Sequence, residues 1–397
     1  MNPRERVARA MRHQEVDRVP VMCQLALGHY FLHGPDRPSQ VWFDSRTFAR
    51  TLEDFRRRYR LDGILVNLPG RPGDWRDYLA GYEQAGQEER LTWGNGLVTR
   101  CPHNDNPHTF MPDGGPLGRA DYARVDPADP ATYRLAGYVW NIWHAPGLFD
   151  LPADADLTQS DAWPDWAFDS VRLAREASPG SSVHAEVFSP FTHLLELFGY
   201  DQALMALIDR PDVCERLLEV FTAMVGAELR RKAACDVDAI LISSAFAGAG
   251  FISRDMYARF VLPYEQSLSR IAHDCGQVIY THTCGAIGDR LDLMLQTGID
   301  GIDTLDPPPL GTVNLEEAKA RYGGRLFLKG NLDAVNEMLR ADDETFRQAV
   351  LDRLRIGSVG SGYILSSACS VAPAVRPERL KLMVELAENW DWRVFPR

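Results

Sequence analysis

The sequence predicts an α/β fold: a (β/α)8 TIM barrel with an N-terminal helical extension and a long insertion after the second strand. Short apolar or β-branched runs alternate with helical segments, which is typical of parallel strands joined by crossover helices. Eight such runs are present, the number at which the sheet closes into a barrel. A doubly wound open sheet is the alternative. The runs are Val19–Cys23, Gly63–Asn67, Ser182–Phe188, Ala239–Ser243, Val278–His282, Ile299–Leu305, Leu326–Lys329 and Tyr363–Ser366.

Helical periodicity is visible before the first run and between several later ones. Pro3–His13 has apolar residues at Val7, Ala10 and Met11 with arginines between them, and predicts a short amphipathic helix packed against a larger body. The same reasoning predicts further helices over Gln202–Lys232, Tyr257–Cys275, Leu315–Tyr322, Glu344–Ile356 and Pro377–Glu388.

The insertion is predicted over about residues 69–181, too many for a βα connection and rich in Trp, Pro, Asp and Gly. Within it, Trp93-Gly94-Asn95-Gly96 predicts a hairpin over Arg90–Thr99. We interpret the insertion as a lid or substrate-specific cap at the barrel mouth. The chain as a whole is expected to form a single barrel domain over residues 1–397.

Composition and net charge indicate which classes of protein this chain can belong to. The chain has 397 residues, 45% hydrophobic and 25% charged, so it can bury a sizeable core. Its formal net charge of −12 disfavours nucleic acid and membrane surfaces as partners. The seven cysteines are scattered and odd in number, which fits reduced thiols better than a disulfide framework. With neither a signal peptide nor a long apolar run in view, we expect a cytoplasmic protein. The sequence leaves open whether it forms a homodimer.

The most informative residues follow the run Val278–His282, where the chain continues as Thr283-Cys284-Gly285. Residues two apart on a strand project from the same face. The imidazole of His282 and the thiol of Cys284 can therefore reach one metal ion at the carboxyl-end rim, where barrel enzymes place their active sites.

Two further side chains are expected at this rim. Tyr363–Ser366 runs on to Cys369, and Ile299–Leu305 ends at Asp306, a carboxylate available for a fourth ligand position or for proton transfer. One imidazole, two thiolates and an exchangeable oxygen are the donors of a catalytic zinc site. The alternative is that His282 is a hydrogen-bonded core histidine and the cysteines are small core residues.

Four polar residues close to strand ends are candidates for substrate binding. Asn67 closes the second predicted strand, Glu186 lies near the end of the third, Ser244 follows the fourth and Asn331 follows the seventh. Each would face the mouth if its side chain points inward. A structural hydrogen bond at a strand end is an equally good explanation for each.

Several short motifs resemble a known family. They include Arg4-Glu5-Arg6-Val7, Asp17-Arg18-Val19-Pro20-Val21, His282-Thr283-Cys284-Gly285, Gly298-Ile299-Asp300, Leu305-Asp306-Pro307-Pro308-Pro309, Lys329-Gly330-Asn331-Leu332-Asp333 and Gly362-Tyr363-Ile364-Leu365. In these residues the chain resembles the uroporphyrinogen decarboxylase superfamily, and within it the zinc-dependent, corrinoid-linked methyltransferases. The resemblance is weakest across residues 69–181.

The resemblance implies a (β/α)8 barrel, in agreement with the count of strands. It also implies zinc bound by His282, Cys284 and Cys369, with Asp306 standing where some members carry Glu. The methyl partner would be a corrinoid (a cobamide). Since the barrel and its insertion account for the length of this chain, that corrinoid is expected on a separate protein.

One departure from the decarboxylases bears on the reaction. Those enzymes hold a polycarboxylate substrate with an arginine-rich segment after the first strand. Here that segment reads Gln24-Leu25-Ala26-Leu27-Gly28-His29-Tyr30, and no arginine follows before Arg37. An apolar, His-containing segment cannot neutralise several carboxylates. Porphyrinogen decarboxylation is therefore disfavoured.

The predicted function is zinc-dependent transfer of a methyl group between a small-molecule donor or thiol acceptor and a corrinoid. Two enzymatic alternatives stay open: a cobalamin-independent zinc methyltransferase acting on a thiol, and a lyase like uroporphyrinogen decarboxylase. A metal-binding or corrinoid-handling module without turnover is a third. The sequence does not identify the donor or the acceptor.

Overall fold

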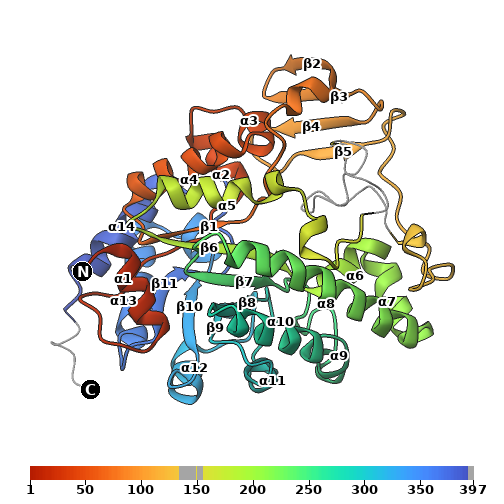
Figure 1. Cartoon of the computed structure of the whole chain (residues 1–397). Helices are drawn as coiled ribbons and strands as arrows, with labels where there is room; N and C mark the ends of the chain where they lie inside the picture. Colours follow the sequence, from red (N-terminus) through yellow and green to blue (C-terminus); the bar gives the residue numbers. More distant parts are fainter. Residues whose placement is uncertain (134–148, 150–154, 392–397) are drawn as a thin grey trace.

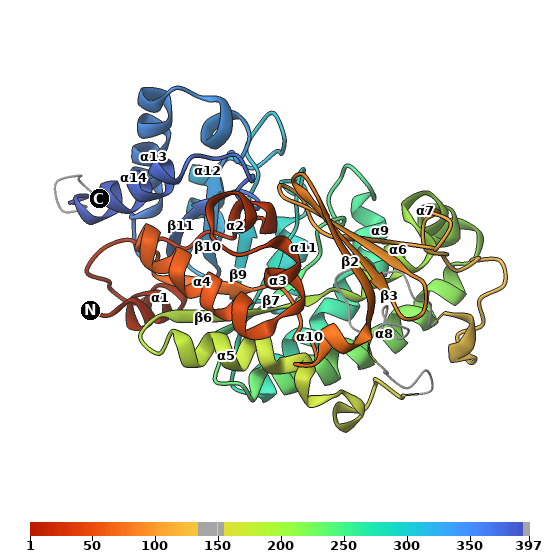
Figure 2. The same cartoon turned by 90° about the horizontal axis from the view of Figure 1, so that it is seen from above.

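The computed structural model describes residues 1–133, 149 and 155–391. Its centre is a seven-stranded parallel sheet in the order β1-β6-β7-β8-β9-β10-β11, which curls inside a layer of helices (Figures 1 and 2). The predicted α/β class and parallel sheet are confirmed. The strands are β1 (Gly63–Val66), β6 (Ser182–Phe188), β7 (Ala239–Ser243), β8 (Val278–His282), β9 (Gly301–Thr304), β10 (Phe327–Leu332) and β11 (Tyr363–Ser367).

The first predicted strand, Val19–Cys23, is wrong as a strand. Within it Val21 forms only an isolated parallel bridge to Leu365 of β11. On its other side, Val21 N–H donates to the Asp62 carboxylate at 2.8 Å instead of to a strand, and Pro20 has no N–H to donate. A short segment thus lies between β11 and the start of β1, and the long insertion follows the first strand of the sheet rather than the second.

The helices cover the outer face of the sheet (Figure 1). The single helix predicted over Gln202–Lys232 is two helices that meet at Pro211, because a proline disfavours helix in the residue before it. The helix predicted over Tyr257–Cys275 divides at Val261, where Pro263 in the first turn of the second helix has no N–H to continue the hydrogen bonds of the first. None of the described helices has the length and apolar character needed to cross a membrane. The helices are α1 (Pro3–Met11), α2 (Leu27–His33), α3 (Pro38–Phe43), α4 (Ser45–Tyr59), α5 (Asp169–Ala177), α6 (Pro190–Phe198), α7 (Tyr200–Asp209), α8 (Pro211–Ala233), α9 (Arg254–Phe260), α10 (Leu262–Asp274), α11 (Leu291–Gln296), α12 (Leu315–Tyr322), α13 (Asp343–Gly357) and α14 (Pro377–Glu388).

Residues 79–110 form a separate four-stranded antiparallel sheet, drawn in orange in Figure 1. The predicted hairpin is confirmed: β3 (Glu88–Trp93) pairs with β4 (Val98–Pro102) across Asn95-Gly96. The buried Trp93 indole donates to Thr99 Oγ1 at 2.7 Å, which fixes the two strands in register. The outer strands of this sheet are β2 (Leu79–Ala85) and β5 (His108–Phe110).

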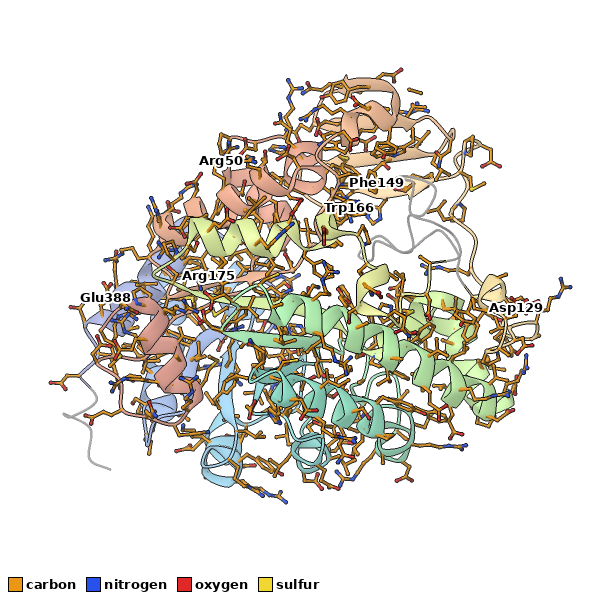
Figure 3. All side chains as sticks on the ribbon, viewed as in Figure 1. Arg50, Asp129, Phe149, Trp166, Arg175 and Glu388 are labelled. Atoms are coloured by element: carbon orange, nitrogen blue, oxygen red, sulfur yellow. The ribbon has the colours of Figure 1, made fainter. Side chains whose placement is uncertain are left out.

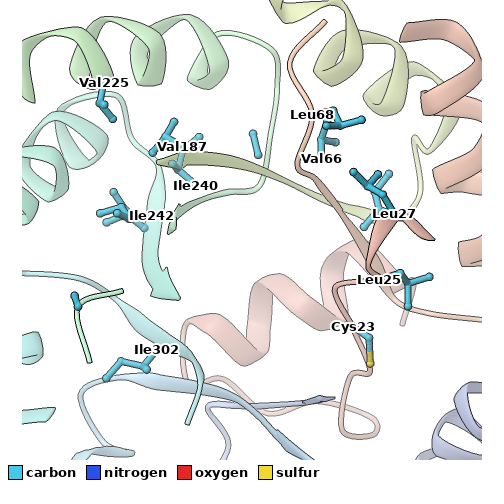
Figure 4. Close-up of a cluster of buried hydrophobic side chains, with 14 of the residues drawn as sticks. Cys23, Leu25, Leu27, Val66, Leu68, Val187, Val225, Ile240, Ile242 and Ile302 are labelled. Carbon is cyan, nitrogen blue, oxygen red and sulfur yellow. The ribbon is translucent and has the colours of Figure 1, made fainter. Parts of the chain in front are cut away.

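Alternation along the strands gives the parallel sheet two different faces. The outward side chains belong to the large core beneath the helices, of which Figure 4 shows Val66, Val187, Ile240, Ile242 and Ile302. The inward side chains form a second, smaller core that α1 closes at the amino ends of the strands. Its members are Val7, Ala10, Met11, Met22, Leu65, Ala239, Leu241, Tyr280, Phe327 and Ile364.

The inward face becomes polar toward the carboxyl ends of the strands. On β8 the inward Tyr280 is followed by His282, and on β10 Phe327 is followed by Lys329. On β9 the last inward residue is Asp303. Buried polar groups need partners, so a cluster of them at one end of an otherwise apolar interior marks the end where a functional site lies.

Glu265 gives the first testable consequence of this packing. Its side chain in α10 is 1% exposed, and burial raises its pKa from 4.5 to about 7. The folded chain therefore binds this proton more tightly than the unfolded chain does, and the resulting stability is present below pH 4.5 and is lost as the pH rises to 7. At pH 8, Glu265→Gln is expected to raise the free energy of unfolding by about 1–3 kcal/mol.

Urea denaturation at pH 4.5 and pH 8 measures this effect, and little difference from wild type is expected at pH 4.5. Glu219→Gln, an exposed position on α8, is the control. An equal gain at both pH values would show that the effect of Glu265→Gln does not come from the buried charge.

Candidate metal centre

Three potential metal ligands converge at the carboxyl ends of β8 and β11. His282 is the last, inward-facing residue of β8, Cys284 lies two residues beyond it, and Cys369 follows β11. His282 Nε2 is 3.3 Å from Cys284 Sγ, which is 3.5 Å from Cys369 Sγ. One ligand atom from each residue lies within 4.8 Å of the others. The sequence-based prediction that these three side chains meet agrees with this geometry.

The spacing of these donors fits zinc. With zinc–sulfur distances near 2.3 Å and zinc–nitrogen distances near 2.0 Å, tetrahedral geometry places two sulfurs about 3.8 Å apart and a sulfur and nitrogen about 3.5 Å apart. The observed separations of 3.5 and 3.3 Å are each within about 0.3 Å of those values. An imidazole and two thiols are also the donor types that zinc prefers.

A buried carboxylate and a buried lysine hold the imidazole. His282 Nδ1 lies 3.3 Å from Asp303 Oδ2, and Lys329 Nζ donates to both oxygens of Asp303 at 3.0 and 2.9 Å. Burial opposes ionisation of Asp303, but the charge of Lys329 and the hydrogen bond from His282 outweigh it and lower the pKa to about 2. An ionised Asp303 accepts a hydrogen bond from Nδ1–H, which orients the ring with Nε2 toward the two thiols.

The two cysteines are not equivalent. A hydrogen bond joins the two thiols, and this bond, together with the nearby His282, holds the pKa of Cys369 well below the usual value of a thiol despite its burial. The same bond and burial raise the pKa of Cys284. Thiols bind a metal as thiolates, so a bound cation would displace the proton that the raised pKa of Cys284 favours.

Asp306 does not join this group of donors. Among the described residues, the group within 4.8 Å contains only the histidine and the two cysteines. Asp306 Oδ2 instead accepts from the backbone N–H of Gly285 at 2.6 Å, beside Cys284. Burial raises its pKa to about 6. The structure thus gives no support to Asp306 as a fourth ligand and shows it anchoring the loop that carries Cys284.

The four predicted substrate-binding residues are all buried but have different surroundings. Glu186 is inward-facing on β6, and burial raises its pKa to about 7. Ser244 Oγ donates to Ser189 Oγ at 3.1 Å, while its N–H donates to the carbonyl of His282. Asn67 directly follows β1. Of these three, Glu186 has the position best suited to contact a ligand above His282.

Asn331 has a structural environment. Its amide N–H donates to the carbonyl of Leu305 at 2.8 Å, and its amide oxygen accepts from Arg353 at 3.3 Å. Both ends of the side chain are thus engaged, and they connect β10 to the turn after β9 and to α13. The structural hydrogen bond that was the alternative for Asn331 is what is observed.

Asp303 and Lys329 are the functional candidates that sequence reasoning missed. Each lies inside a run already predicted as a strand, and alternation places both on the inward face with His282. The available signal was a lysine and an aspartate in the middle of neighbouring apolar strands, because charges buried there must pair.

Comparison with known proteins agrees with this architecture. The family model described as "Uroporphyrinogen decarboxylase (URO-D)" matches residues 152–390. The chain belongs to the uroporphyrinogen decarboxylase family. Within this family, it is 32% identical over 228 residues to the uroporphyrinogen decarboxylase of Alkalilimnicola ehrlichii, covering 55% of this chain and 60% of that protein. It is 27% identical over 249 residues to that of Methylibium petroleiphilum, covering 57% of this chain and 63% of that protein. The alignments thus span about three-fifths of these family members.

A solved structure extends the likeness along the whole chain. The methyltransferase from Methanosarcina mazei superposes with a TM-score of 0.68, covering 98% of each chain at 17% sequence identity. At this identity the likeness establishes a shared fold. The fold of the family and the curled parallel sheet therefore agree with the predicted barrel-like architecture.

Proposed function

We propose that this family member is a zinc-dependent methyltransferase that moves a methyl group between a small-molecule donor or thiol acceptor and a corrinoid carried by a partner protein. The observation that supports it best is the convergence of His282, Cys284 and Cys369 within 4.8 Å at the carboxyl ends of the strands. Two thiol ligands suit a site that binds sulfur or another soft donor. A decarboxylase that relies on cationic side chains has no need of such a cluster.

The roles of the chain's own residues follow from their contacts. A zinc ion bound there would supply Lewis-acid chemistry, which favours the thiolate form of a bound thiol or improves a leaving group. Asp303 and Lys329 keep the Nε2 lone pair of His282 in place. Asp306 holds the Cys284 loop through Gly285, and Glu186 is a candidate to exchange a proton with the substrate near neutral pH.

The rim beside the Cys284 loop supports the proposed partner. Tyr200, Phe246 and Phe251 form a ring cluster with centroid distances of 4.7 Å for Tyr200–Phe246 and 5.3 Å for Phe246–Phe251. Tyr200 and Phe251 are 39% and 43% exposed. The loop with the two phenylalanines packs on the metal loop, since a Cβ on Gly248 would lie 2.8 Å from the Cys284 carbonyl oxygen. An exposed aromatic rim offers a contact surface to a protein that delivers a corrinoid.

Decarboxylation is the second candidate, because the curated relatives are uroporphyrinogen decarboxylases. Against it stands the segment from Gln24 to Tyr30, which contains no arginine to pair with substrate carboxylates. The cobalamin-independent methyltransferase keeps the same zinc ligands and differs only in the methyl donor.

Parallel assays of the zinc-loaded protein separate the three reactions. Methylcobalamin with a panel of small thiols is expected to give a thioether product and the spectral change of demethylated cobalamin. A sulfonium or folate methyl donor, supplied without cobamide, is expected to give no product. Uroporphyrinogen III, supplied in a separate assay, is also expected to give no product. Carbon dioxide release from uroporphyrinogen, without methyl transfer from methylcobalamin, would overturn the proposal in favour of decarboxylation. Cobamide-free transfer alone would favour the second methyltransferase.

A further inference from the structure

Arg71, in the segment that follows β1, is a buried cation that has no counterion within residues 1–133, 149 and 155–391. The side chain is 4% exposed. Its nearest hydrogen-bond acceptor is the neighbouring carbonyl of Gly70, at 3.5 Å from Nη1, and its Nε is buried with no hydrogen-bond partner. The backbone is well held, because Arg71 N–H donates to Ser45 Oγ at 2.9 Å. The chain thus fixes the backbone of this residue but leaves its Nε donor without a partner.

The other buried arginines among the described residues each pair with a carboxylate. Arg6 and Arg175 pair with buried or half-buried aspartates, and Arg290 donates to a neighbouring aspartate and to two carbonyls. The Nε of Arg379 is also buried without a partner, but its Nη atoms donate to backbone carbonyls and to an aspartate. Among the described residues, no carboxylate pairs with Arg71. The positive charge of Arg71 therefore lies out of water with a single long hydrogen bond from Nη1 and with its Nε donor unpaired.

Such an arrangement is unfavourable unless a ligand completes it. A buried ion without a partner lowers the stability of the fold, whereas a planar guanidinium binds a carboxylate or phosphate through two parallel hydrogen bonds. Burial alone lowers the pKa of Arg71 to about 10, so the group remains charged at neutral pH. The missing partner is an anion.

The position of Arg71 connects it to the barrel mouth. Its backbone lies against Ser45 at the amino end of α4, and Gly70 N–H donates to the carbonyl of Ala167 just before α5. Both helices precede parallel strands, so their amino ends lie at the carboxyl ends of those strands, the end that also carries the candidate metal centre.

An aromatic surface lies above the guanidinium. The Arg71 Cζ is 5.8 Å from the centre of the Phe149 ring, and Phe149 also contacts Trp93 and Trp166 at 5.7 and 6.0 Å. Figure 3 shows Phe149 and Trp166 together between the antiparallel sheet and the helices of the barrel. A cation beside aromatic rings suits an anionic group attached to an apolar or planar body.

We propose that Arg71 is a substrate-binding residue for an oxyanion, a carboxylate or phosphate group on the small molecule that enters the barrel mouth. The assignment of this anion to the substrate rests on the proposed function. The binding of an anion by Arg71 does not, since it follows from the buried, unpaired guanidinium.

The test is the thermal unfolding temperature of the full chain, at constant ionic strength set with chloride, during titration with inorganic phosphate or acetate. Wild type is expected to gain about 2–5 °C at saturation with at least one of them, because an anion that binds only the folded state stabilises it. Arg71→Met is expected to lose this gain while unfolding no lower than wild type when no anion is added. Arg46→Met, an exposed arginine beside Ser45, removes the same charge and keeps the gain.

The two anions distinguish a carboxylate ligand from a phosphate ligand. A structural role for Arg71 would instead lower the unfolding temperature of Arg71→Met equally with and without anion, and would overturn the proposal. Wild type that responds to neither anion would also overturn it. If Arg71→Met does not fold, Arg71→Lys is the second variant, because it keeps the charge and loses the planar pair of donors. It is expected to need at least a tenfold higher anion concentration to reach half of its gain in unfolding temperature. Zinc content is expected to be unchanged in every variant, so this result is separable from failure of the metal centre.

Discussion

Cys284→Ala and Cys369→Ala are each expected to abolish stoichiometric zinc binding and to reduce methyl transfer by more than about 100-fold. This factor is a lower bound. Loss of a group that only supports a metal ligand already lowers metal affinity or activity by about 10–100-fold, and these substitutions remove the ligands themselves. Wild type should contain about one zinc per chain, as three donors and an open position form one catalytic site. Metal content by inductively coupled plasma mass spectrometry and the cobalamin assay measure the two effects.

Cys275→Ala is the matched control, because this cysteine is exposed just after α10 and precedes the amino end of β8, whereas the ligands lie at its carboxyl end. It should retain both zinc and activity. Urea denaturation of all three variants checks that metal loss does not reflect unfolding. Wild type without zinc, or zinc retained in both ligand variants, would contradict the metal centre and remove the main support for the methyltransferase.

Much of the fold could be predicted because the strands are buried on both faces and read as continuous apolar runs. The bounds predicted for β6, β7 and β8 are the observed ones. Prediction failed where a local interaction replaced strand pairing. At Val21 the carboxylate of Asp62 takes the N–H that a neighbouring strand would need. At Thr304 and Leu305 the backbone adopts positive φ, which ends β9 before the predicted boundary.

The candidate site was predictable to the extent that residue type and strand position determine it. His282, Cys284 and Cys369 were predictable because residues two apart share one face of a strand, and the carboxyl ends of the strands meet at one rim. The role of Asp306 could not be predicted from its position in the sequence, because the hydrogen bond that its carboxylate accepts from the backbone N–H of Gly285 exists only in the folded loop. Arg71 gave no signal either. An arginine in a loop is normally exposed, and only the packing of Phe149 and Gly70 around it reveals that it is not.

Lys329→Met is expected to lower the free energy of unfolding of the metal-free protein by about 3–5 kcal/mol. Lys329 and Asp303 are 1% and 2% exposed, and Nζ lies within 3.0 Å of both carboxylate oxygens. Removing the ammonium leaves the Asp303 charge buried, with His282 and the backbone N–H of Thr304 as the partners that remain. Urea denaturation in the presence of a chelator measures the loss. Lys381→Met, a partly exposed lysine on α14, should change stability by less than about 0.5 kcal/mol.

Replacing both members of the pair separates its two roles. Asp303→Asn removes the charge that holds Nδ1 of His282, so zinc affinity measured by competition with a chelating dye is expected to fall about 10–100-fold. The double variant with Lys329→Met contains no uncompensated charge and should lose less stability than the two single variants together. Its zinc affinity should nevertheless stay as low as that of Asp303→Asn. Recovery of stability without recovery of zinc affinity would mean that Asp303 and Lys329 serve to orient His282. Unchanged zinc affinity in Asp303→Asn would contradict this, and would mean that the pair contributes only to the packing of the fold.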